Sequence, residues 1–320
     1  MSRLLPLAPC IPFVCAPAYP FAQAWREALQ AAMPHERIVA LDALDAQARA
    51  ACDLAIVANP DPSDLATLPR LQWVHSVWAG VERLVEDLQH SPVDIVRLVD
   101  PQLAATMAEA VLAWTLYLHR DMPRYARQQA AGQWLEHDYV PPQDKTVALL
   151  GLGELGTACA AKLLAAGFQV SGWSRRRKAV AGVQCFAGAD ELPALLARAD
   201  ILVCLLPLTP ATQGMLNAQT LGLLRPGASL INFARGAIVD DDALRAALDS
   251  GQLGHAVLDV FHQEPLPEAQ WQWEHQQVTV LPHISAPTNR RTASAIVAQH
   301  VRGYRENGAM PVVVDKLRRY

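Results

Sequence analysis

Three side chains capable of acid–base or charge-stabilising chemistry, Arg235, Glu264 and His283, each follow an apolar run in the second half of the chain. A histidine hydrogen-bonded to a carboxylate favours its imidazolium form, which can give a proton to a developing alkoxide. A neighbouring arginine stabilises the same negative charge. Taken singly, each residue also fits a plainer reading: a turn arginine, a loop glutamate or a structural histidine. Together with a hydride donor, they are the groups needed to reduce a 2-keto acid.

A glycine-rich turn offers a place for that hydride donor. The apolar run Val147–Leu150 ends in GLGELG, residues 151–156, and a helix of small residues follows. Gly151 permits the tight turn, Gly153 lets the backbone approach a pyrophosphate, and Gly156 lets the helix pack close to the strand. A similar turn in some other α/β protein is the plainer alternative, but the flanking strands favour a dinucleotide bound at the helix N-terminus. The residues assigned to this site are Gly151, Gly153, Glu154, Leu155 and Gly156.

The end of the next strand indicates which dinucleotide is preferred. The apolar run Phe168–Trp173 is followed by Ser174-Arg175-Arg176-Arg177-Lys178, where an acid would accept hydrogen bonds from a ribose 2′-hydroxyl. Guanidinium groups instead bind phosphate oxygens in pairs. We therefore expect NADP(H) to be preferred and NAD(H) to be possible. Ser174, Arg175 and Arg176 are assigned to the 2′-phosphate, although the sequence leaves open which of the three arginines reach it.

Strand-like and helical patterns alternate along the whole chain, which predicts a parallel α/β fold. Its 320 residues are enough for two domains. The expected strands are Ile11–Cys15, Leu54–Ala58, Gln72–Ser76, Ile95–Leu98, Val147–Leu150, Gln169–Trp173, Ile201–Leu206, Ser229–Phe233, Ala256–Val260 and Val278–Leu281. The expected helices are Phe21–Ala32, Asp64–Leu68, Val81–Leu88, Leu103–His119, Gly156–Ala166, Glu191–Ala197, Ala218–Leu224, Asp241–Ser250 and Thr288–Asn307. The helix Leu103–His119 has little polar surface and should be buried, whereas Thr288–Asn307 is expected to return to the first domain.

Composition excludes several other classes of protein. The net charge is −4 with acids and bases interspersed, which argues against a nucleic-acid partner or an acidic membrane surface. No apolar stretch approaches the roughly 20 residues of a membrane span. Prolines interrupt the apolar N-terminus, so Pro12–Ala16 fits a first strand better than a signal peptide, and a cytoplasmic protein is expected. The six cysteines and ten histidines show no paired or clustered pattern, so neither disulfides nor a metal site are indicated.

Seven segments carry a resemblance to a known family: HSVWAGVE, GLGELG, GWSRRRK, LLPLTPATQGMLN, NFARGAIVDDDALRAALDSG, LDVFHQEPLP and LPHISA. In this order, from about Leu71 to the C-terminus, they resemble the D-isomer-specific 2-hydroxyacid dehydrogenases, and among these the glyoxylate/hydroxypyruvate reductases. The resemblance implies two Rossmann-like, doubly wound parallel-sheet domains with a cleft between them. Residues 1–100 with 288–320 would form the substrate-binding domain, and residues 101–287 the dinucleotide-binding domain.

The same resemblance assigns roles to individual residues. Arg235 would bind substrate, Glu264 would be the partner of the histidine, and His283 would be the acid/base. The backbone N–H groups of Ala79 and Gly80 would bind the substrate carboxylate. Trp78, expected as an exposed loop side chain, would either contact substrate or simply cover the cleft. The further cofactor-binding residues are Thr106, Leu206, Pro207, Phe233, Ala234, Asp259, which would hold the nicotinamide carboxamide, His283 and Ser285.

These observations predict an NADPH-dependent reductase of small 2-keto acids, with glyoxylate and hydroxypyruvate as the first candidates. Because the loop Ala58–Pro62 lacks bulky residues, a larger 2-keto acid stays open as substrate. A dinucleotide-sensing regulatory protein on the same scaffold is the alternative from another class. The apolar helix Leu103–His119 and the family resemblance both favour a homodimer.

Overall fold

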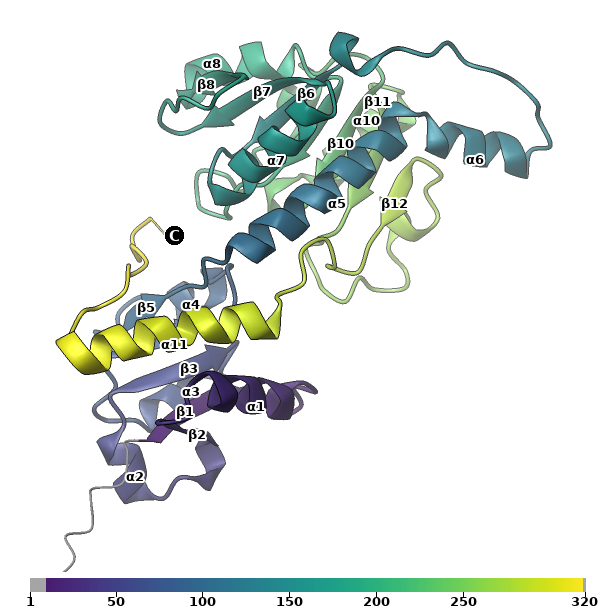
Figure 1. The fold of residues 1–320 in the computed structure, drawn as a ribbon. Helices are drawn as coiled ribbons and strands as arrows, with labels where there is room; N and C mark the ends of the chain where they lie inside the picture. Colours follow the sequence, from purple (N-terminus) through teal and green to yellow (C-terminus); the bar gives the residue numbers. More distant parts are fainter. Residues whose placement is uncertain (1–9, 319–320) are drawn as a thin grey trace, which may run out of the picture. The chain divides into compact units, whose positions relative to one another are not determined.

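The structure, a computed structural model, describes residues 10–318 of the chain. Two compact units are present. The first contains the described residues up to Gln102 and those from Thr288 onward, and the second contains Leu103–Pro287. Each unit is built on one wholly parallel sheet with helices on both faces (Figure 1). The predicted α/β fold with two parallel sheets is confirmed.

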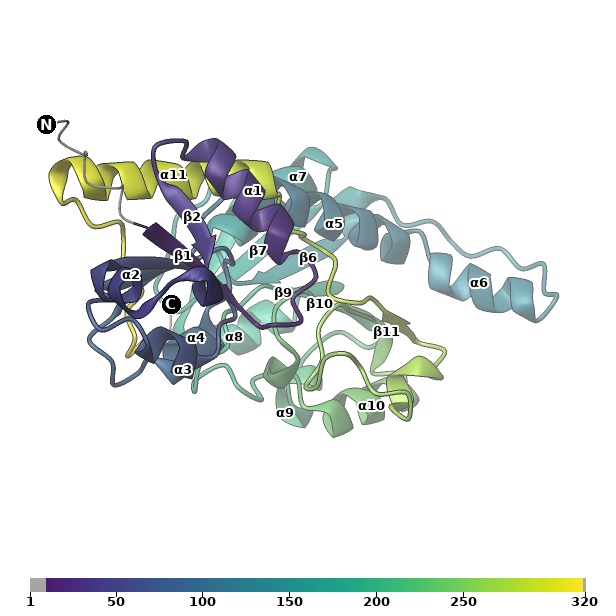
Figure 2. The ribbon, with the colours of Figure 1, turned by 90° about the horizontal axis from the view of Figure 1, so that it is seen from below.

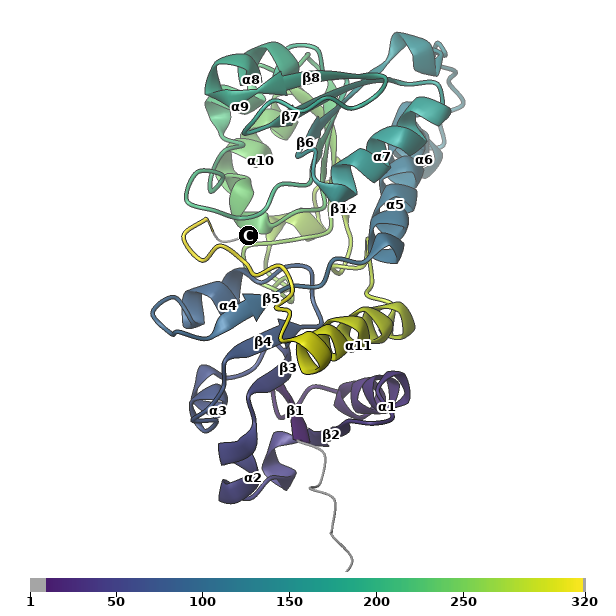
Figure 3. The ribbon, with the colours of Figure 1, turned by 60° about the vertical axis from the view of Figure 1, so that its left-hand side comes forward.

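The first unit has five strands in the order β2-β1-β3-β4-β5. Its strands are β1 (Cys10–Cys15), β2 (Arg37–Ala40), β3 (Leu54–Ala58), β4 (Trp73–Ser76) and β5 (Asp94–Val96). Helices α1 (Ala22–Ala32) and α11 (Arg290–Asn307) lie side by side on one face of the sheet (Figures 2 and 3). The other face carries α3 (Pro62–Ala66) and α4 (Glu82–Asp87), while α2 (Ala46–Ala51) precedes β3.

Strand β3 shows why both layers of helices pack on this sheet. Leu54 and Ile56 belong to the apolar cluster that also contains Trp25 of α1 and Val297 of α11. Ala55, between them, belongs to the cluster formed with α3 and α4. Successive side chains of a strand point to opposite faces, so a strand that is apolar at every position serves both layers. All five residues of β3 are accordingly buried.

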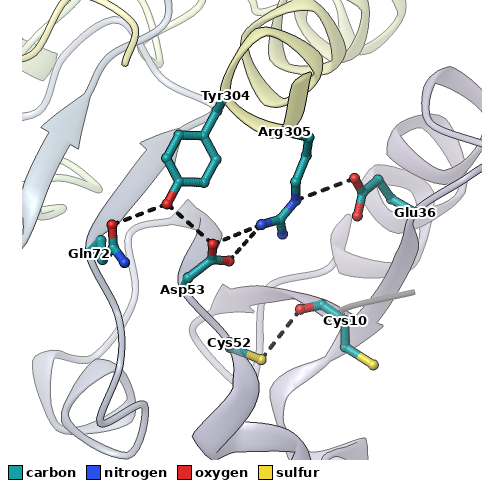
Figure 4. A network of polar contacts seen from close by, with 7 residues as sticks. All are labelled: Cys10, Glu36, Cys52, Asp53, Gln72, Tyr304 and Arg305. Atoms are coloured by element: carbon teal, nitrogen blue, oxygen red, sulfur yellow. Dashed lines mark hydrogen bonds and ion pairs between the residues drawn. The ribbon is translucent and has the colours of Figure 1, made fainter. Parts of the chain in front are cut away.

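A network of polar side chains ties α11 to the sheet of the first unit (Figure 4). Arg305 Nη1 lies 2.9 and 2.8 Å from the two carboxylate oxygens of Asp53, and its Nε lies 3.5 Å from Oε1 of Glu36. The Tyr304 hydroxyl lies 3.2 Å from Asp53 Oδ2 and 3.1 Å from Gln72 Oε1. The side chains of Arg305, Asp53 and Glu36 are only 22%, 24% and 17% exposed. The ion pairs are therefore largely shielded from solvent.

Replacing Arg305 by methionine is expected to lower the free energy of unfolding by roughly 3 kcal/mol, because two partly buried carboxylates lose their cation. Denaturant unfolding followed by circular dichroism measures this change. The control is Arg302→Met, which removes an exposed arginine from the same helix and should change stability by less than about 0.5 kcal/mol. Equal stability of the two variants would show that the network does not stabilise the unit.

The second unit has seven strands in the order β12-β11-β10-β9-β6-β7-β8. Its strands are β6 (Thr146–Leu150), β7 (Gln169–Ser174), β8 (Val183–Ala187), β9 (Ile201–Cys204), β10 (Ala228–Asn232), β11 (Leu253–Leu258) and β12 (Val278–Val280). Helices α5 (Pro101–His119) and α7 (Glu154–Ala165) cover one face (Figure 3). Helices α8 (Gly188–Leu196), α9 (Ala218–Leu221) and α10 (Asp241–Asp249) cover the other. The strand order reverses between β6 and β9, which is the switch point where ligands bind in doubly wound sheets.

The remaining helical segments lie at the edges of these layers. Helix α6 (Met122–Ala130) and the residues after it extend away from the seven-stranded sheet (Figures 1 and 2). Single 3₁₀ turns occur at Leu41–Ala43, Pro142–Asp144, Gly236–Ile238 and Trp271–Trp273. Between residues 10 and 318, no helix is both long enough and apolar enough to pass through a bilayer.

Several element predictions are wrong in detail. Strands β2 and β8 were not expected, so the first sheet has five strands instead of four and the second has seven instead of six. Both are outer strands with mostly half-exposed side chains. Strand β8 lacks the apolar run that marks an inner strand, whereas the short apolar run of β2, residues 38–41, was overlooked. Helices α2 and α6 were also not expected. Strand β11 begins and ends earlier than expected, and β9 stops at Cys204.

Helix α5 also differs from its prediction. The sequence favoured a fully buried helix, but its buried residues lie along one face only. Leu116, on the opposite side, is 39% exposed. Within this chain, the apolar surface of α5 is therefore only partly covered.

Candidate active site

The glycine-rich turn joins β6 to α7 beside the switch point of the second sheet. Gly151 has a φ of +108°, a conformation that favours glycine. A Cβ at position 156 would lie 1.9 Å from the Gly151 carbonyl oxygen, so no side chain fits there. Gly153 is the N-cap of α7, without a side-chain cap, and a Cβ there would meet no atom within 4 Å. The first N–H groups of α7 are thus uncapped where a phosphate binds to a helix N-terminus.

The basic turn, defined as Ser174–Lys178, starts at the end of β7, the strand next to β6. Leu150 pairs with Trp173 in the ladder, so the basic turn and the glycine-rich turn lie at the same edge of the sheet. In the first turn of α7, Glu154 is exposed and Leu155 packs against the core. An open helix N-terminus next to a cluster of cations fits a dinucleotide that carries a 2′-phosphate.

Other residues assigned to the cofactor follow neighbouring strands and are mostly buried. Leu206, Phe233, Ala234 and Ser285 are 7%, 5%, 4% and 6% exposed. The Ser285 hydroxyl oxygen has no hydrogen-bond partner in the part of the chain that the structure describes. A buried hydroxyl is normally satisfied, so this one fits a polar group supplied from outside the chain. Two others, Pro207 after β9 and Thr106 on α5, are half-buried.

The structure brings two of the three predicted catalytic side chains into direct contact. Arg235, Glu264 and His283 follow the neighbouring strands β10, β11 and β12, all at the carboxyl edge of the sheet. His283 Nδ1 lies 2.7 Å from Glu264 Oε2, and the second oxygen of Glu264 accepts the Phe261 N–H at 3.0 Å. The side chains of His283 and Glu264 are 52% and 37% exposed, so a small molecule from solution can reach the pair.

The charges around this pair shift both of its pKa values. The hydrogen bond that His283 donates to Glu264 raises the pKa of His283, and it outweighs partial burial and the positive charge of Arg235, which both lower that pKa. Burial alone would raise the pKa of Glu264, but the hydrogen bonds from His283 and the Phe261 amide hold it below its usual value. The pair therefore favours the imidazolium–carboxylate state, in which the histidine can donate a proton.

Gly236 lets the loop that carries Arg235 lie against the loop that leads to Glu264. A Cβ at position 236 would lie 2.1 Å from the carbonyl carbon of Phe261 and 2.4 Å from the backbone nitrogen of His262. The loop after β10 therefore contacts the loop that leads to Glu264 through bare backbone. Arg235, one residue earlier, donates from Nη1 to the Ala234 carbonyl at 2.6 Å, and its charge acts on both Glu264 and His283.

The backbone at His283 is held in an uncommon conformation. Its φ is +54°, in the left-handed region, which is unfavourable for any residue that has a Cβ. Asp259, 2% exposed, accepts the N–H of Ile284 at 2.7 Å and that of Ser285 at 2.9 Å. These two bonds fix the turn that presents the imidazole. The nicotinamide-binding role expected for Asp259 stays a prediction.

The predicted substrate loop belongs to the first unit, directly after β4. The expectation that Trp78 is exposed is wrong. The indole is half-buried, with edge-on contacts to Tyr19 and Trp25 at centroid distances of 6.2 and 5.8 Å. Ala79 and Gly80 are half-buried, and their N–H groups have no hydrogen-bond partner among residues 10–318. These amides are thus suited to an acceptor that the chain itself does not supply.

Comparison with known proteins identifies the family. A family model described as "D-isomer specific 2-hydroxyacid dehydrogenase, NAD binding domain" matches residues 112–285, which is more than half of the chain. The chain belongs to this family. A glyoxylate/hydroxypyruvate reductase A from Serratia proteamaculans (strain 568) is 39% identical over 311 residues, covering 94% of this chain and 98% of the reductase. The family predicted from the seven sequence segments, and with it a nicotinamide-dependent dehydrogenase, is confirmed.

Solved structures of the family superimpose on almost the whole chain. A D-isomer specific 2-hydroxyacid dehydrogenase from Xanthobacter autotrophicus Py2, in complex with NADPH and MES, has a TM-score of 0.91 and 38% identity. The match covers 97% of this chain and 100% of that one. An NADPH-dependent glyoxylate/hydroxypyruvate reductase from Sinorhizobium meliloti, in complex with NADP and sulfate, has a TM-score of 0.88 and 33% identity, with the same coverage.

Two residues that shape the site of this dehydrogenase were not assigned a role from the sequence. Gly236 carries a signal, since a glycine directly after a strand-end arginine marks a close backbone approach. Lys178, whose ammonium group lies 2.6 Å from the Leu152 carbonyl oxygen of the glycine-rich turn, carries none, because its partner is 26 residues away.

Proposed function

We propose that this dehydrogenase reduces small 2-keto acids to 2-hydroxy acids with NADPH, and that glyoxylate and hydroxypyruvate are its first substrates. The observation that carries the proposal is the 2.7 Å hydrogen bond between His283 and Glu264, at the sheet edge that also holds the glycine-rich turn. The Serratia and Sinorhizobium relatives, both named as reductases of these acids, support the substrate class. The basic turn, and the NADPH and NADP of the two related structures, support a preference for NADP(H) over NAD(H).

In the proposed reaction the bound dinucleotide supplies a hydride to the keto carbon. His283 donates the balancing proton from Nε2 to the substrate oxygen, since Nδ1 is occupied by Glu264. The guanidinium of Arg235 stabilises the negative charge that develops on that oxygen and binds the substrate carboxylate. Gly151, Gly153 and the N-terminus of α7 hold the pyrophosphate. The second unit is thus the proposed dinucleotide-binding domain.

The first unit is the proposed substrate-binding domain. We assign the carboxylate of the substrate to the N–H groups of Ala79 and Gly80, which have no partner among the described residues. Gly80 keeps the approach of an anion free of a side chain. Because Trp78 packs against Tyr19 and Trp25, its proposed contribution is to fix this loop.

A steady-state screen tests the proposal. Glyoxylate, hydroxypyruvate and about ten larger aliphatic and aromatic 2-keto acids are each assayed with NADPH and with NADH. The expected result is the highest kcat/KM for the two small acids with NADPH. Higher kcat/KM for a bulky acid would favour the alternative of a larger substrate, and equal values with NADH would contradict the role of the basic turn. No turnover of any acid, with retained NADPH binding, would favour a dinucleotide-sensing protein.

The pH dependence of reduction should report the Glu264–His283 pair. Because the pKa of His283 is raised, its imidazole stays protonated to a higher pH than is usual for histidine. The rate is therefore full at low pH and falls as pH rises through that pKa. In Glu264→Gln the main cause of the shift is lost and the pKa drops. The high-pH limb of the kcat/KM profile should then move to lower pH, with about tenfold or greater loss at pH 8 that acidification partly restores. An unmoved limb would assign the titration to another group.

We further propose a homodimer formed through the second unit. Helices α5 and α6 and the residues after them expose large apolar side chains, which on a monomer would face water. They are Leu116, Met122, Tyr125, Trp134, Leu135, Tyr139 and Val140. Trp134 is 97% exposed, and sedimentation equilibrium should show that Trp134→Ser shifts the equilibrium from dimer toward monomer.

A cytoplasmic location is part of the same proposal, supported by the absence of disulfides among the described cysteines.

A further inference from the structure

The basic turn carries four cations within five residues, and like charges at this spacing repel one another. Such a cluster keeps one shape only if the surrounding protein holds part of it. Hydrogen bonds to the surrounding protein hold Arg177 and Lys178.

Arg177 is held by β8 and α8. Its Nη1 donates to the Cys185 carbonyl at 2.9 Å, and its Nη2 forms an ion pair with Glu191 Oε1. The other carboxylate oxygen of Glu191 accepts the Ala187 N–H at 2.7 Å. Both terminal nitrogens of this guanidinium are therefore used by the protein. Glu191 in turn links the basic turn to the start of α8.

Lys178 is held by the other phosphate-binding segment. Its ammonium group donates to the carbonyl of Leu152, which lies between Gly151 and Gly153. The side chain of Leu152 is fixed too, because it packs where a Cβ at Gly172 would stand, 2.5 Å away. One charged hydrogen bond thus joins the basic turn to the glycine-rich turn.

A further hydrogen bond closes the turn on itself. The Ser174 hydroxyl donates to the Arg176 carbonyl at 2.7 Å. Arg175 and Arg176 lie at the tip of the turn. Ser174, which closes the turn, precedes them, and Arg177 and Lys178, which the protein holds, follow them.

We propose that Glu191, acting through Arg177, and Lys178, acting through Leu152, are positioning residues with separate tasks. Glu191 keeps the basic turn in the shape that selects a 2′-phosphate, which Arg175 and Arg176 then bind. Lys178 keeps the glycine-rich turn in place for the pyrophosphate, which both dinucleotides share. This inference rests on the proposed function, since it requires a dinucleotide at the glycine-rich turn.

Calorimetric titration of the full chain with NADP⁺ and with NAD⁺ tests both tasks without measuring turnover. Glu191→Gln removes a negative charge beside the basic turn, so electrostatics alone would strengthen the binding of NADP⁺. A positioning role predicts the opposite sign: affinity for NADP⁺ falls about fivefold, while affinity for NAD⁺ stays within about twofold. Lys178→Met should weaken both dinucleotides by a similar factor of roughly ten, as expected for a charged hydrogen bond.

Two variants serve as controls. Arg198→Met removes one positive charge from the same unit, at an arginine that donates to Gln184 Oε1 at 2.9 Å, and should leave both affinities unchanged. Arg176→Met should weaken NADP⁺ alone. Retained NAD⁺ binding by Glu191→Gln shows that this variant is folded.

Unchanged or tighter NADP⁺ binding by Glu191→Gln would overturn the role of Glu191. A loss confined to NADP⁺ in Lys178→Met would overturn that of Lys178. If the unaltered chain binds neither dinucleotide, the proposed function itself is wrong.

Discussion

Replacing His283 by alanine is expected to lower kcat for glyoxylate reduction about 10²- to 10⁴-fold, the range typical of a positioned acid–base group. Glu264 occupies Nδ1, so the proton must leave from Nε2, which the alanine variant lacks. Binding of NADPH, followed by fluorescence, should stay within about twofold, because the glycine-rich and basic turns are unaltered.

A matched control for this variant exists in the same unit. His275 Nε2 lies 3.2 Å from Asp249 Oδ1, and it forms a second histidine–carboxylate pair. His275→Ala should retain nearly full turnover. If His283→Ala reduces glyoxylate at the normal rate, the acid has been assigned to the wrong residue.

The second large effect is expected for Arg235→Gln, which should lower kcat/KM about 10²- to 10³-fold through loss of charge stabilisation at the developing oxyanion. The same change should move the pH profile. Because Arg235 lowers the pKa of His283, its removal lets that pKa rise, and the high-pH limb of the profile shifts upward. This is the direction opposite to that expected for Glu264→Gln. Steady-state rates from about pH 5 to 10 measure both effects.

Arg245→Gln is the control for charge alone. Arg245 is exposed on α10 and lies 3.9 Å from Asp249, so its removal changes the net charge equally without altering the site. Normal kcat/KM in Arg235→Gln, or a pH limb that moves downward, would contradict the placement of the guanidinium beside the histidine.

Much of the fold follows from local sequence because inner strands of a parallel sheet are apolar at every position. Leu54–Ala58 and Thr146–Leu150 are almost wholly buried, and both were expected as strands within a residue of their bounds. Strand β8, an outer strand, is partly exposed and its side chains carry no comparable pattern, whereas β2 has only a short apolar run.

The candidate site also has features that the sequence predicts and features that it does not. Parallel strands end at one edge, so the rule that ligands bind there was enough to group Arg235, Glu264 and His283. The burial of Trp78 was not predictable, because its partners Tyr19 and Trp25 lie more than 50 residues earlier in the chain. The contact between Lys178 and Leu152 arises likewise only when β6 and β7 pair.

The return of α11 to the first sheet has a consequence for biosynthesis. The apolar surface that includes Trp25 and Ile56 is completed by Ala293, Val297 and Val301, which a ribosome adds only after the whole of the second unit. The second unit, Leu103–Pro287, is by then fully polymerised and can fold first. The nascent first unit must therefore keep part of its hydrophobic face open until α11 emerges from the ribosome.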